Sequence, residues 1–80
     1  MFADGFEDAI IGIQWGDVSR VVYDKEMMET ILMQRDGMTH EEAIEYLEYN
    51  VWGAYVGEGT PIYINRGGYQ EVIEFIESNT

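Results

Sequence analysis

Carboxylates are the reactive side chains that this sequence groups most clearly by spacing. Asp and Glu supply 16 of the 80 residues, Lys and Arg supply four, and the formal net charge is −12. One group of glutamates recurs at intervals that place it on one side of a helix. Its members are Glu41, Glu45 and Glu48, bordered by Glu42. Such a surface repels nucleic acids and anionic membranes and attracts basic proteins.

These glutamates have three interpretations, which the sequence leaves open. A solvated face that maintains solubility is the simplest. A surface that occupies a basic groove is the second, because neighbouring carboxylates on a helix lie about 6 Å apart, close to the spacing of phosphates along one strand. Binding of a hard cation is the third, but it needs several converging oxygens, and the scattered aspartates form no EF-hand loop. We expect no dedicated metal site.

The residues of nucleophilic catalysis are sparse. His40 is the sole histidine, and the chain has no cysteine. Ser19 or Ser78 would have to meet His40 by folding alone. Gly67 and Gly68 lack the spacing of a phosphate-binding loop and are typical of a structural turn. We therefore expect neither an enzyme nor a cofactor.

Aromatic residues form a second spaced group beside the glutamates. They are Tyr46, Tyr49, Trp52 and Tyr55. A stripe of this kind is either the edge of a core, with Tyr hydroxyls in water, or a contact patch rich in the residue types of binding hot spots. The contact-patch interpretation makes Tyr49 and Trp52 the anchors for a partner. The same stripe is the subunit interface if the protein self-associates.

Six elements are predicted to position these side chains, in the order β-β-α-α-β-α. They are a buried strand at 9–15, a strand at 20–23, a helix at 25–35, a helix from 39 to an end between 50 and 57, a strand at 62–64 and a helix at 69–77. The fold class is α+β: a small three-stranded antiparallel sheet packed by two to three helices. Residues 1–80 form a single small acidic domain.

Local signals mark two of the helix starts. Asp24 suits the N-cap of the first helix, and Thr39 with Glu42 fits a capping box. The first helix carries an apolar stripe of Met28, Ile31 and Leu32, and the second a buried stripe of Ala43, Ile44, Leu47 and Val51. The last helix carries its apolar residues, among them Val72 and Ile76, on one face. No apolar run is long enough to cross a membrane, and the acidic start argues against a signal peptide. Without cysteine there is no disulfide.

Segments at 6–12, 21–24 and 36–46 precede a longer motif, Asn50-Val51-x-Gly53-Ala54-Tyr55-Val56-Gly57-Glu58-x-Thr60-Pro61. With these segments, residues 6–64 resemble a family of small acidic proteins of tailed bacteriophages, and the motif is the most specific part. The resemblance implies the cytoplasm of an infected host bacterium. It also implies an inhibitor of host defence or of host nucleic-acid enzymes.

The predicted function joins this context to the charge. We expect a phage accessory protein that binds and inhibits a basic host protein or nucleoprotein complex, as an anti-CRISPR or other anti-defence inhibitor or a DNA mimic. Direct contact with nucleic acid or membrane is not expected. The partner-binding residues would be Glu41, Glu42, Glu45, Glu48, Tyr49 and Trp52. The alternative is a self-associating structural module, a homo-oligomer without enzymatic activity.

Overall fold

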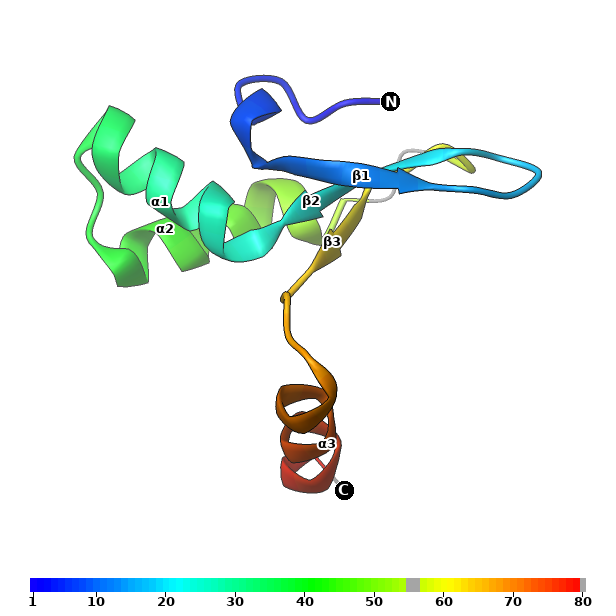
Figure 1. Cartoon of the computed structure of the whole chain (residues 1–80). Helices are drawn as coiled ribbons and strands as arrows, with labels where there is room; N and C mark the ends of the chain where they lie inside the picture. The colour runs from blue at the N-terminus through cyan, green and yellow to red at the C-terminus, as the bar shows by residue number, and fades with distance from the viewer. Residues whose placement is uncertain (55–56, 80) are drawn as a thin grey trace.

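The computed structural model describes residues 1–54 and 57–79, and its element order confirms the α+β class (Figure 1). The chain alternates strands and helices in the predicted order β-β-α-α-β-α, with two additional short turns. The elements are η1 (Glu7–Ala9), β1 (Ile10–Gln14), β2 (Arg20–Asp24), α1 (Lys25–Asp36), α2 (His40–Leu47), η2 (Glu48–Trp52), β3 (Ile62–Ile64) and α3 (Tyr69–Ser78).

The sheet has the strand order β1-β2-β3 and is mixed rather than purely antiparallel. β1 and β2 form a hairpin and pair antiparallel as predicted, but β3 runs parallel to β2. The chain between β2 and β3 passes through α1, α2 and η2. A crossover of this length returns the chain to the end where β2 began, which is what parallel pairing requires.

Strand register separates two faces of the sheet. Tyr23 pairs with Tyr63, and their ring centroids lie 5.6 Å apart on the face that meets the core. The neighbouring pairs Val22–Ile62 and Asp24–Ile64 fall on the opposite face, because successive side chains alternate along a strand. The β1–β2 hairpin extends beyond the helices (Figure 1), so β1 is not the buried strand that the sequence predicted: Ile13 is 65% exposed.

The core lies between one sheet face and the helices α1 and α2. Its buried members are Phe6, Ala9, Tyr23, Met28, Leu32, Ala43 and Leu47. Met28 and Leu32 lie on the predicted stripe of α1, and Leu47 lies on that of α2, so the helical period located these positions correctly. Phe6 belongs to the N-terminal lead, whose packing the sequence did not indicate. Ala9 was expected to start the buried strand; it is buried, but it ends η1 instead.

The helix ends follow their local chemistry. The Asp24 side chain accepts hydrogen bonds from the N–H groups of Glu26 and Met27 at 2.9 and 3.2 Å, and so caps α1 as predicted. Gly37 follows α1 with a φ of 68°, the left-handed conformation that favours glycine. The capping box of Thr39 and Glu42 is also present at the start of α2.

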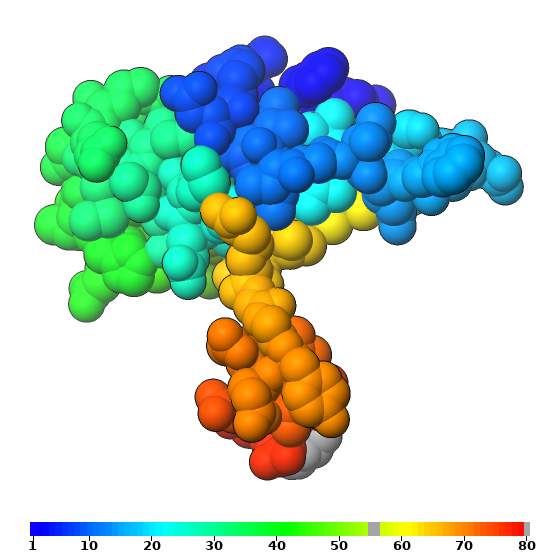
Figure 2. All heavy atoms as spheres, viewed as in Figure 1, coloured from blue at the N-terminus to red at the C-terminus, as the bar shows by residue number. Residues whose placement is uncertain are grey.

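Helix α3 stands apart from this body. Figure 2 shows it, in orange and red, projecting away from the sheet and the other helices. None of its residues is buried, although its sequence is strongly amphipathic. Among the residues that the structure describes, no helix combines the length and apolar character of a membrane span.

Candidate functional site

The predicted carboxylates lie along α2 and at the first residue of η2. Glu41, Glu45 and Glu48 are all exposed. The capping box fixes the first turn of the helix, so the glutamates that follow project from a defined start. The sequence prediction therefore placed these three carboxylates on a common, water-facing surface.

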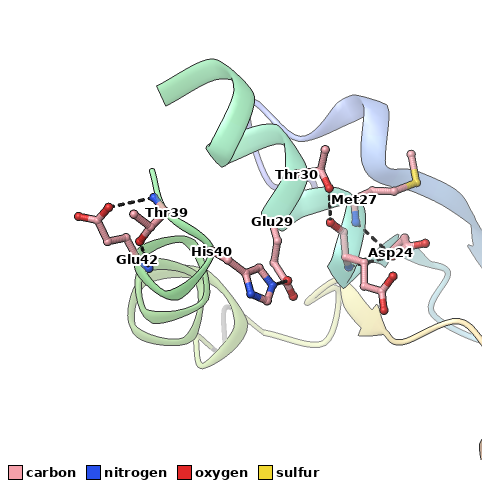
Figure 3. A network of polar contacts seen from close by, with 8 residues as sticks. Asp24, Met27, Glu29, Thr30, Thr39, His40 and Glu42 are labelled. Atoms are coloured by element: carbon pink, nitrogen blue, oxygen red, sulfur yellow. Dashed lines mark hydrogen bonds and ion pairs between the residues drawn. The ribbon is translucent and has the colours of Figure 1, made fainter. Parts of the chain in front are cut away.

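Glu42 differs from its neighbours because its carboxylate is engaged. Its Oε1 accepts a hydrogen bond from the Thr39 N–H at 2.9 Å, while its own N–H donates to Thr39 Oγ1 (Figure 3). Hydrogen bonds from the Thr39 backbone and side chain lower the pKa of Glu42 below its usual value. Glu42 is therefore anionic at neutral pH and held in place.

The aromatic stripe is divided by a change of helix type. At Glu48 the α-helical hydrogen bonding gives way to a π turn, η2, whose wider winding shifts the residues that follow. Tyr49 is 88% exposed. Trp52 turns inward, donates from Nε1 to Met28 Sδ at 3.5 Å, and lies under Lys25 Nζ at 4.2 Å from the ring centroid. Tyr55 lies outside the described residues.

Two predicted anchors therefore have different surroundings. Tyr49 presents nearly its whole ring to solvent beside the glutamates. Trp52 is partly buried and packs against the core, so most of its contacts are already made within the chain. The sequence prediction assumed that α-helical spacing continues through residue 52, so it could not distinguish the two aromatic residues. No sequence signal indicated the π turn.

A shallow, open hollow lies where the glutamates meet the aromatic rings. We call it the α2 hollow, and its lining is Met38, Glu42, Glu45, Tyr46, Tyr49 and Asn50. The Asn50 amide donates to the Tyr46 carbonyl at 3.0 Å and closes one end of the turn. Carboxylates beside aromatic faces are the groups that hold a guanidinium or ammonium.

His40 joins α2 to α1. Its Nε2 lies 2.5 Å from Glu29 Oε1 (Figure 3), and the two residues come from facing helices. The contact places the imidazole at the helix junction rather than beside a nucleophile. Among the described residues, no three His, Asp or Glu side chains converge in a geometry that would hold a metal ion.

The best-connected carboxylate, Asp24, lies outside the predicted site. It is 4% exposed, and its Oδ2 accepts a hydrogen bond from Arg66 Nε at 2.6 Å while Oδ1 caps α1. Burial favours the neutral acid, but the hydrogen bonds from Arg66, Met27 and Glu26 outweigh burial and lower the pKa of Asp24. Sequence reasoning found the cap and missed Arg66, because the two residues are far apart in the chain.

Comparison of the chain with protein-family models, with curated proteins and with solved structures finds no match. The resemblance to phage proteins therefore stays a prediction. The function is inferred below from the chemistry of the protein surface.

Proposed function

We propose that this protein is a small acidic binding module that docks the α2 hollow onto a basic protein surface. One observation carries the proposal: Glu42 and Glu45 line the same hollow as Tyr46 and Tyr49. An arginine or lysine side chain entering there meets a carboxylate and an aromatic face together. That combination recognises a cation better than scattered surface acids do.

Charge and aromatic contact would contribute differently to binding. An exposed ion pair is worth only about 0–1 kcal/mol, so the glutamates on the rim supply steering and selectivity more than affinity. Tyr49 offers a large exposed ring, and rings of this type dominate many interfaces. Its position beside Glu45 in the hollow supports Tyr49 as the principal anchor.

In the phage context that the resemblance implies, the partner would be a basic host protein or nucleoprotein complex. If the module covers a surface that normally holds a phosphate backbone, binding would exclude the nucleic acid. Inhibition of an anti-CRISPR or other anti-defence type then needs no catalysis. Glu41, Glu45 and Glu48 supply the regular row of charge for such competition.

An NMR titration tests the surface assignment. An oligoarginine peptide is added to the labelled full-length protein, first at about 50 mM salt and then at about 300 mM, where screening is stronger. We expect the largest amide shifts between residues 38 and 50, with weaker binding at the higher salt. The double variant Glu41→Lys/Glu45→Lys should lose most of this response.

A matched variant separates the hollow from general acidity. Asp8→Lys/Asp17→Lys makes the same change in net charge at exposed positions on other elements. We expect it to retain binding at residues 38–50. Equal losses in the two double variants, or shifts spread evenly over all acidic segments, would contradict the proposal.

A further inference from the structure

A second hollow adjoins the α2 hollow and takes no part in the proposed contact with an arginine or lysine. The N-terminal lead, η2 and β3 line it, and its volume is about 470 Å³, within the about 300–1,000 Å³ of ligand pockets. Apolar and aromatic groups dominate its walls, among them Phe2, Val51, Pro61 and Tyr63. Asp4 is the one charged residue in its described lining. We call this surface the N-terminal hollow.

The wall that the N-terminal lead contributes is held in place. The Ala3 N–H donates a hydrogen bond to the Tyr23 hydroxyl at 2.7 Å, and Arg35 Nη1 donates to the Gly5 carbonyl at 2.9 Å. Phe6 is 5% exposed, and the Arg35 guanidinium lies 5.5 Å from the centroid of its ring. The hollow is therefore bounded by a segment that is fixed to both β2 and α1.

The two hollows share a wall. Tyr46 and Asn50 line both of them, and the hydrogen bond from the Asn50 amide to the Tyr46 carbonyl spans the turn between these residues. Glu42 and Glu45 lie in the α2 hollow, whereas the N-terminal hollow is mainly apolar. A chain that crosses the shared wall therefore passes from a site for a cation to a site for an apolar side chain.

Charge decides what kind of chain can occupy both hollows. A second copy of this protein and a nucleic acid are both repelled by a surface of a molecule whose net charge is −12. A segment of a basic protein is attracted, and its arginine or lysine can enter the α2 hollow. A large apolar side chain on the same segment would leave water on entering the N-terminal hollow, which favours binding.

We propose that the partner segment carries a large apolar side chain about three residues from an arginine or lysine. The spacing follows from Glu45 and Val51, one in each hollow, which lie about 9 Å apart along the helix axis at about 1.5 Å per residue. An extended chain advances about 3.3 Å per residue, so about three residues cover that distance. This inference rests on the proposed function, to which it adds the feature that selects among basic segments.

The two contacts have separate tasks in this arrangement. The carboxylates draw many basic segments to the surface, because long-range attraction depends on charge more than on sequence. The N-terminal hollow then distinguishes segments by the side chain that they can bury. The affinity gained from burial is not screened by salt, whereas the attraction between charges is.

Matched synthetic peptides test the spacing with the full-length protein. The first has a phenylalanine separated by two linker residues from an oligoarginine run, and the second has serine in place of the phenylalanine. By calorimetry, we expect the phenylalanine peptide to bind about tenfold more tightly, at about 50 mM and at about 300 mM salt. In NMR spectra it should shift amides at 2–6 and 61–63 as well as at 38–50. A third peptide, with phenylalanine directly beside the first arginine, should lose the gain.

The variant Phe2→Ser tests the hollow itself. Phe2 is 67% exposed, so its replacement should leave the fold intact while removing an aromatic wall. We expect this variant to lose the tenfold preference for the phenylalanine peptide and to bind the serine peptide as the wild type does. The control Phe75→Ser makes the same change at a ring that is 62% exposed on α3, and it should retain the preference.

The outcomes separate this inference from the proposed function. Equal affinity for the phenylalanine and serine peptides, with shifts confined to residues 38–50, would overturn the inference and leave the α2 hollow as a cation site. A preference that does not depend on the position of the phenylalanine would also overturn it, because the two hollows would then not act on one segment. If none of the peptides bound, both proposals would be wrong.

Discussion

Asp24→Ala tests whether one buried carboxylate joins α1 to the segment that leads into α3. The substitution removes the cap for the N–H groups of Glu26 and Met27, which should cost about 1 kcal/mol. It also removes the charge-assisted bond to Arg66, worth about 1.5–3 kcal/mol in general. Arg66 is 61% exposed and can be rehydrated, so the lower end applies.

The expected total is a loss of about 2–3 kcal/mol in the free energy of unfolding. The free energy of unfolding of a domain of this size is only about 3–5 kcal/mol. The variant should therefore approach its unfolding midpoint on warming, even without urea. Urea titration followed by far-ultraviolet circular dichroism measures the change. Thr39→Ala is the matched control, because it removes the exposed cap of α2 and no ion pair.

Asp24→Asn separates the two contributions. Asparagine caps a helix about as well as aspartate, so this variant should keep the cap and lose only the charge that Arg66 contacts. We expect its stability to fall between that of the wild type and that of Asp24→Ala. If Asp24→Ala were no more damaging than Thr39→Ala, the contact with Arg66 would contribute nothing and the reasoning would be refuted.

Three further predictions concern the same fold. The pKa of Asp24 is lower in the folded state than in the unfolded state, so its carboxylate should stabilise the fold fully above about pH 4 and less as pH falls through the folded pKa. Urea titrations from pH 7 to 3 should therefore show that Asp24→Asn loses less unfolding free energy on acidification than the wild type does. Gly37→Ala should destabilise by about 1 kcal/mol, measured by urea titration, because its φ of 68° strains an L residue; an unchanged midpoint would contradict the left-handed C-cap. Trp52→Ala should lower stability by about 2–3 kcal/mol through lost packing on Met28, and thermal unfolding with no change in midpoint would place Trp52 outside the core.

The correct predictions from sequence rest on interactions between near neighbours in the chain. Asp24 and the pair Thr39–Glu42 were identified because a cap bonds to N–H groups two or three residues away. The buried positions of α1 and α2 followed from a period that holds while the helix stays α-helical. The exposed positions of Glu41 and Glu45 on α2 were found for the same reason.

The errors arise where distant segments decide the outcome. The direction of β3 depends on where the chain returns after two helices. No residue pattern within β3 itself therefore indicates that it pairs parallel to β2. The π turn at Glu48 reorients Trp52 although the spacing of the aromatic residues still fits an α-helix. For α3, the amphipathic spacing showed which residues form its apolar side, but it could not show that none of them is buried in the structure.

Parallel pairing of β3 has a consequence for the order of folding. β1 with β2, and α1 with α2, are neighbours in sequence and need to close only short loops. β3 pairs with β2 only after the chain has closed a loop that spans the whole helical segment. The entropy of closing this larger loop is lost before the contacts between the two strands can stabilise the fold. We therefore expect β3 to dock last and to detach first, carrying the Arg66 contact with it. The hairpin, α1 and α2 would then exchange their amide protons as one cooperative unit, and the segment from β3 through α3 as a weaker one.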